Sequence, residues 1–144
     1  MLETIAVGTD GSDTALRAVE FALDLAEKYG SRMVFISSYR PVSEGRVKAE
    51  QRDAPADIQW SINPAEDVEA ALRAVEEMAD TRGLKWTSEA RQGDPADVLV
   101  EIAEAHGADL LVIGNKGMQR RVLGSVPNSV THKANCSVVI VKTT

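Results

Sequence analysis

Apolar and polar positions divide the chain into strand-like and helix-like segments that alternate. Four of the strand-like segments are continuous apolar runs, which predict strands covered on both faces, as in a parallel sheet. The fifth alternates apolar and polar residues, which predicts an edge strand. The five predicted strands are 4–7, 33–36, 85–91, 108–113 and 137–141, with 85–91 as the edge strand.

Between these strands, apolar residues recur every three or four positions, which predicts amphipathic helices. Cap residues stand at the expected helix ends. They are Ser12 or Asp13 before the helix at 14–29, Gly30 after it, and the pairs Asn63-Pro64 and Asp94-Pro95 before the next two helices. Strands that alternate with helices predict an open, doubly wound parallel sheet with helices on both faces. The polar segment 40–62 is interpreted as an irregular crossover.

Composition narrows the possible classes of protein. The 144 residues, 44% apolar and 26% charged, fit one globular domain over 1–144. A net charge of −6 argues against a general DNA- or RNA-binding protein, and no apolar run approaches the roughly 20 residues that span a bilayer. The start lacks the pattern of a signal peptide, and the single cysteine, Cys136, fits a reducing compartment. We therefore expect a cytoplasmic protein without nucleic-acid or membrane partners.

The segment 114–129 carries the strongest sign of chemistry. Glycines follow a predicted strand and precede a short helix, and Lys116, Arg120 and Arg121 add cations. Backbone amides in such a loop, together with a helix N-terminus, favour a phosphate group. The alternative is that the glycines make a turn and a helix start without a ligand. The nucleotide-hydrolase phosphate loop and the dinucleotide Gly-x-Gly-x-x-Gly pattern are both absent.

Asp10 lies at the end of the first predicted strand, on the edge where open α/β sheets bind ligands. Its carboxylate suits two adjacent ribose hydroxyls, or it forms an Asx turn with nearby amides. Ser125 either contacts phosphate or caps the last helix. His106 and His132 are interpreted as structural, because no cysteines or acids accompany them at metal-ligand spacing, and Cys136 as a small core residue.

Several motifs together resemble the universal stress protein family. They are Gly8-Thr9-Asp10-Gly11-Ser12 before a helix, Gly114-x-x-Gly117, Gly124-Ser125-Val126 and a final strand beginning at Cys136. The resemblance implies a five-stranded, Rossmann-like fold of the adenine nucleotide alpha hydrolase type, which binds an adenine nucleotide and forms a homodimer.

The resemblance also implies roles for individual residues. Asp10 would hold the ribose hydroxyls, and Gly8, Thr9, Ser38 and Ile113 would contact adenine. The residues around the phosphates would be Gly114, Gly117, Gly124, Ser125 and Val126.

Three positions depart from the family pattern. Six residues, rather than the usual nine, separate Gly117 from Gly124. Pro127 has no amide hydrogen to donate at the start of the last helix. Gly8 stands where nucleotide-binding relatives often have proline, which makes the turn less rigid. The departures leave open whether the phosphate site is tighter or more selective.

The sequence therefore favours a stress-response or regulatory protein that binds ATP, AMP or cyclic AMP, with Mg²⁺ accompanying the phosphates. Two alternatives stay open: a slow ATPase or nucleotidyl-transfer enzyme, and a dimeric interaction module without nucleotide. An apolar terminal strand would leave a sticky edge, so we predict a homodimer through 137–142. The alternative is an interior strand with neighbours on both sides.

Overall fold

Strands and helices alternate along the chain, as the hydrophobic pattern predicts. The computed structural model describes residues 2–39, 65–115 and 125–142. Its elements are β1 (Thr4–Gly8), α1 (Asp13–Tyr29), β2 (Arg32–Tyr39), α4 (Ala65–Thr81), β3 (Trp86–Gln92), α5 (Pro95–Ala105), β4 (Leu110–Gly114), α6 (Ser125–Lys133) and β5 (Ser137–Val141).

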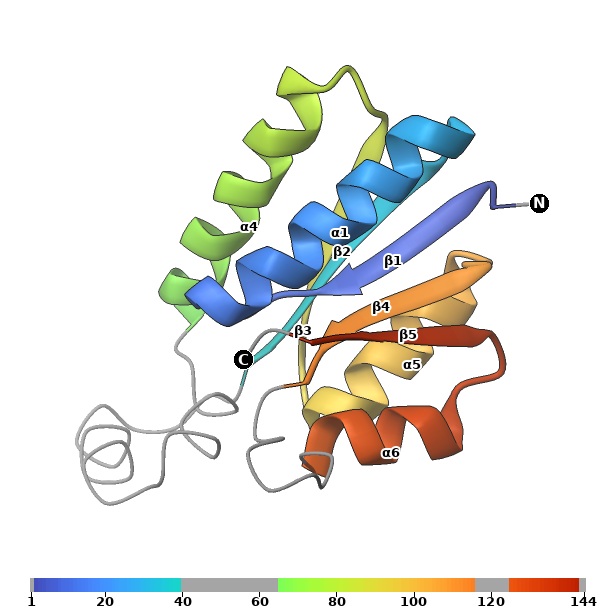
Figure 1. Ribbon diagram of the computed structural model, residues 1–144. Coiled ribbons are helices and arrows are strands. Elements are labelled where there is room, and N and C mark those ends of the chain that lie inside the picture. The colour runs from blue at the N-terminus through green and yellow to red at the C-terminus, as the bar shows by residue number, and fades with distance from the viewer. Residues whose placement is uncertain (1, 40–64, 116–124, 143–144) are drawn as a thin grey trace.

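The five strands form one parallel sheet in the order β3-β2-β1-β4-β5. Helices α1 and α4 lie on one face of the sheet, and α5 and α6 lie on the other (Figure 1). The predicted doubly wound α/β sheet is therefore confirmed, including the edge position of β3. The order also places β5 at the opposite edge, which removes the alternative of an interior last strand.

The core consists of two apolar layers, because successive strand side chains point to opposite faces. Ile5 and Val7 pack with α1 and α4, whereas Ala6 packs with α5 and α6. Phe35 and Ile36 divide between the layers in the same way. Continuous apolar strands thus supply both layers, which is why the runs do not alternate.

Two strand boundaries differ from the sequence prediction by more than one residue. β2 continues through Ser37 and Ser38 to Tyr39, since all three pair with β3. β4 begins at Leu110 rather than at residue 108, since its pairing with β1 and β5 begins there; the Asp109 carboxylate accepts hydrogen bonds from the amides of Glu3 and Thr4. The predicted helix start at Asn63-Pro64 and the predicted crossover at 40–62 lie outside the described residues.

The helix ends follow the predicted cap chemistry. Ser12, rather than Asp13, is the N-cap of α1, and its Oγ accepts a hydrogen bond from the Ala15 amide. Gly30 ends α1 with a left-handed backbone, φ 68°, and Asp94 caps α5 in front of Pro95. In the described parts of the chain, no helix has the length and apolarity needed to cross a membrane.

Candidate functional site

The predicted site residues that the structure describes gather at the carboxyl ends of the strands. All five strands are parallel, so these ends lie along the same side of the sheet, and the chain order reverses between β1 and β4. Open α/β sheets form a ligand crevice at such a switch point. Gly8 ends β1, Ser38 lies near the end of β2, and Ile113 and Gly114 end β4.

Buried hydrogen bonds fix the turn that follows β1. The Thr9 amide donates to the Ile36 carbonyl at 2.9 Å, and the Ser37 hydroxyl donates to the Thr9 carbonyl at 2.7 Å. The Gly11 amide donates to Thr9 Oγ1 at 3.2 Å. Thr9 is only 1% exposed, so β2 holds the turn from below and sets the position of Asp10.

Asp10 forms the local turn that the sequence offered as one of its two roles. Its Oδ1 accepts hydrogen bonds from the Ser12 amide at 2.9 Å and the Ser12 hydroxyl at 2.6 Å. A carboxylate offers about four acceptor positions, so this Asx turn is compatible with a ligand role. The turn fixes the orientation of the carboxylate at the mouth of the crevice.

The ends of β2 and β4 supply a buried floor of both polar and apolar residues. Ser38 is 6% exposed and Ile113 is 4% exposed, and the Ile113 side chain packs in the layer below α5 and α6. Contact between Ile113 and a ligand would therefore involve its backbone. Asn115, which was not among the predicted site residues, is buried beside Gly114. Its backbone amide donates a hydrogen bond to the Val141 carbonyl at 3.1 Å.

Gly8 has a packing role that the sequence did not reveal. A Cβ atom at this position would lie 2.6 Å from Cδ2 of Leu99 on α5. Leu99 is buried in the layer between the sheet and α5, so it has little room to move. The glycine thus lets α5 approach the end of β1 directly below the site.

We expect Gly8→Ala to lower the free energy of unfolding by about 1–3 kcal/mol, the usual range for overpacking a core. Urea unfolding measures this change. Leu99→Val removes the clashing methyl group, so Gly8→Ala should have a smaller effect in that background. An equal effect in both backgrounds would show that the contact with Leu99 is not the reason.

The first turn of α6 brings backbone amides to the same edge (Figure 1). Ser125 is exposed at its first position, and Val126 is half-buried against the core. Pro127, at the third position, is buried and donates no amide hydrogen. Gly117 and Gly124, together with the three cations between 116 and 121, lie outside the described residues.

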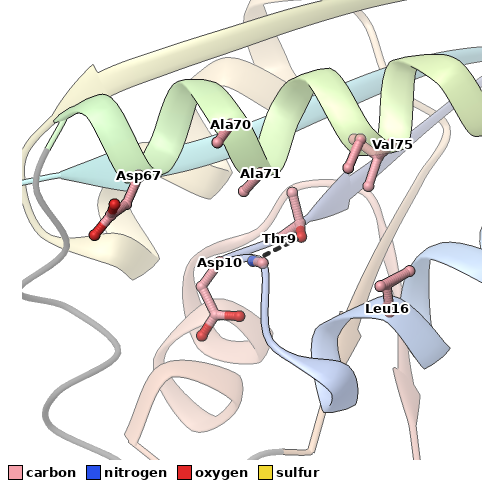
Figure 2. A pocket seen from close by; sticks show the side chains of 9 residues that line it. Thr9, Asp10, Leu16, Asp67, Ala70, Ala71 and Val75 are labelled. Atoms are coloured by element: carbon pink, nitrogen blue, oxygen red, sulfur yellow. Dashed lines mark hydrogen bonds between the residues drawn. The ribbon is translucent and has the colours of Figure 1, made fainter.

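A hollow of about 430 Å³ opens between the turn after β1 and helix α4. Figure 2 shows Asp10 on the turn and Asp67 on α4, on the two facing walls of this hollow. Three alanines, Ala70, Ala71 and Ala74, form much of its α4 wall. These α4 residues are not among the predicted site residues, although small residues gathered on one side of a predicted helix were a signal that could have indicated them.

The remaining candidate residues take part in surface and core contacts. His106 is the C-cap of α5, with Nε2 3.3 Å from Glu89 Oε2. Cys136 is half-buried just before β5, and burial raises the pKa of its thiol, which disfavours the nucleophilic thiolate. Within the described residues, no three histidine, cysteine or acidic side chains gather as a metal site.

Comparisons with known proteins agree with this architecture over the whole chain. The model of the universal stress protein family matches residues 1–142. A universal stress protein of Mycobacterium tuberculosis (strain CDC 1551 / Oshkosh) is 36% identical over 146 residues, covering 99% of this chain and 97% of the relative. One from Methanocaldococcus jannaschii is 31% identical over 150 residues, covering 99% and 83%.

Solved structures give the same assignment. A universal stress protein in complex with cAMP matches with a TM-score of 0.75 and 33% identity, covering 99% of this chain and 98% of the other. One from Archaeoglobus fulgidus in complex with dAMP shares the fold, with a TM-score of 0.67, 24% identity, and coverage of 97% and 98%. The family model over residues 1–142 and the relative at 36% identity show that the chain belongs to the universal stress protein family.

Proposed function

We propose that this protein binds an adenine nucleotide in the crevice beyond the carboxyl ends of β1 and β4. The observation that carries the proposal is the convergence of Asp10, Ser38, Gly114 and the first turn of α6 at one edge of the sheet. Asp10 faces the ribose in this proposal, and the α6 amides face the phosphates, because helix N-termini favour anions. Gly8 and Thr9 lie beside the base.

Two related structures support this class of ligand. One is a universal stress protein in complex with cAMP and the other is in complex with dAMP. Both ligands contain adenine, a sugar and one phosphate, which fits a site with a carboxylate on one side and helix amides on the other. ATP, AMP and cyclic AMP are therefore the three candidates to compare.

The phosphates would lie near Gly114, Ser125 and Val126, with Gly117 and Gly124 assigned to the same role from the sequence. Magnesium is proposed only as a companion of the phosphates, since Mg²⁺ commonly binds through phosphates and a few carboxylates. We propose a regulatory role in the cytoplasm, in which nucleotide occupancy sets the state of the protein. A single cysteine and an acidic chain fit that compartment.

Isothermal titration of the purified protein with ATP, AMP and cyclic AMP tests the proposal, with GTP as the control for the base. We expect at least one adenine nucleotide to bind more tightly than GTP. Mass spectrometry of gently purified protein should detect a co-purifying adenine nucleotide. Failure of all three ligands to bind at millimolar concentration would contradict the proposal, and steady-state phosphate release from ATP would favour an enzyme instead.

We also propose that the protein forms a homodimer through β5. This strand is at the edge of the sheet, and its four apolar residues, Val138 to Val141, stay half-exposed in the single chain. Native proteins cover or pair an apolar edge strand, since its unpaired backbone groups invite association. Two copies of β5 pairing around a two-fold axis would form a self-complementary interface.

A further inference from the structure

Ser37 places a hydroxyl group in the interior of the protein, near the carboxyl end of β2. It follows four buried apolar residues, 33–36, and is itself only 3% exposed. Phe35, two positions earlier, lies in the layer with α1 and α4, so the Ser37 side chain points to the same layer. A buried hydroxyl needs a hydrogen-bond partner. Ser37 Oγ donates to the Thr9 carbonyl at 2.7 Å, so β2 reaches across to the turn that follows β1.

This hydrogen bond fixes the peptide group that precedes Asp10. Gly8 and Ile36 are the last paired residues of β1 and β2, so the chain leaves the sheet at Thr9. There the Thr9 amide donates to the Ile36 carbonyl at 2.9 Å, and Ser37 holds the Thr9 carbonyl. That carbonyl belongs to the planar peptide that joins Thr9 to Asp10. Its direction therefore sets the direction in which the Asp10 backbone begins.

The other hydrogen bonds around Asp10 lie within the turn itself. The Gly11 amide donates to Thr9 Oγ1 at 3.2 Å (Figure 2), and the Ser12 amide and hydroxyl donate to Asp10 Oδ1. Bonds between neighbours in the turn keep its shape but would move with it as a unit. The bond from Ser37 ties the turn to the sheet instead, so it governs where the Asp10 carboxylate stands relative to the end of β4.

We propose that Ser37 is a positioning residue for ribose recognition. It acts through the Thr9 carbonyl, and it holds the Asp10 carboxylate where that group accepts a hydrogen bond from the 2′-hydroxyl. The inference rests on the nucleotide-binding function proposed above. Hydrogen bonds weaken steeply when their distance and angle depart from the ideal, so a turn that has lost this tie discriminates less between ribose and deoxyribose. Phosphates near α6 do not depend on the tie.

Ser37→Ala removes the donor and leaves the backbone of β2 unchanged. We expect the ratio of ATP affinity to 2′-deoxy-ATP affinity, measured by isothermal titration, to fall by about threefold to tenfold. This is part of the loss of about tenfold to a hundredfold expected for a charge-assisted hydrogen bond. Inorganic tripolyphosphate should bind as it does to the wild type. Ser37→Cys keeps a side chain of similar shape with a weaker donor, so it should lower the ratio too and keeps the test available should the alanine variant not fold.

Ser31 provides a matched control at the opposite end of β2. It is also 3% exposed, and its hydroxyl also donates to a backbone carbonyl, that of Leu2. Urea unfolding should show that Ser31→Ala and Ser37→Ala both destabilise the fold, whereas Ser37→Ala alone should change the ratio of the two affinities. In an Asp10→Asn background, Ser37→Ala should change the ratio no further, because both substitutions act on one contact.

The outcomes separate this inference from the function on which it rests. A folded Ser37→Ala protein with the wild-type ratio would overturn the positioning role. So would an equal change of the ratio in Ser31→Ala, since the effect would then follow stability alone. Wild-type protein that binds ATP and 2′-deoxy-ATP equally well would overturn the ribose role of Asp10 and that of Ser37 together. Wild-type protein that binds no adenine nucleotide would overturn the proposed function itself.

Discussion

We expect the wild-type protein to behave as a dimer at micromolar concentration, with twice the chain mass of 15.5 kDa in light scattering. The reason is the position of β5, whose outer edge has no neighbouring strand in the sheet order of the described residues. Half-exposed apolar residues along Val138 to Val141 add to the association through their burial. A monomer at that concentration, with and without ATP, would contradict the dimer.

The backbone directions in β5 provide a selective way to break this dimer. The Val141 carbonyl accepts from the Asn115 amide next to β4, so the backbone groups of Val141 face β4. Because these directions alternate along a strand, the Ile140 amide faces the open edge. Proline is tolerated at such outward positions. Ile140→Pro should therefore remove an intermolecular donor and place a ring in the interface without losing a bond to β4.

Ile140→Pro is thus expected to yield a folded monomer, whereas Val139→Pro, whose amide faces β4, should also destabilise the fold. Light scattering and urea unfolding together separate these outcomes. Ile140→Ala is the matched control, since it loses the side chain but keeps the amide. A dimer that persists in the folded Ile140→Pro protein would assign the interface to another surface.

The second large effect is expected at Asp10. Asp10→Asn keeps a side-chain oxygen for the Ser12 amide but loses the charge, so the turn should survive. The contribution of a charge-assisted hydrogen bond is about 1.5–3 kcal/mol, which corresponds to a loss of about tenfold to a hundredfold in ATP affinity. Isothermal titration measures this loss. Asp13→Asn, which removes a neighbouring exposed carboxylate in the first turn of α1, is the control.

A deoxy ligand reveals which hydroxyl is involved. Wild-type protein should prefer ATP over 2′-deoxy-ATP, and Asp10→Asn should reduce that preference. Equal losses for both ligands would count against recognition of the 2′-hydroxyl. Asp10→Ala is expected to lower stability as well, since it also removes the acceptor for the Ser12 amide and hydroxyl.

The sequence by itself determined the elements that depend on near neighbours. Apolar runs located four strands, alternation located the fifth, and the spacing of three and four located the helices, since each pattern reflects local backbone geometry. Gly30 and Asp94 marked helix ends because caps act within a few residues. The Asx turn of Asp10 was one of two predicted roles for the same reason.

Only the tertiary structure decided which distant segments meet. Strand order placed β5 at an edge, where the sequence allowed an interior position. The contact of Gly8 with Leu99 and the alanine wall opposite Asp10 join segments far apart in the chain. Such contacts arise from the packing of helices onto two faces of one sheet, which periodicity along the chain does not encode. The pattern therefore predicted where Asp10 lies, and packing determined what surrounds it.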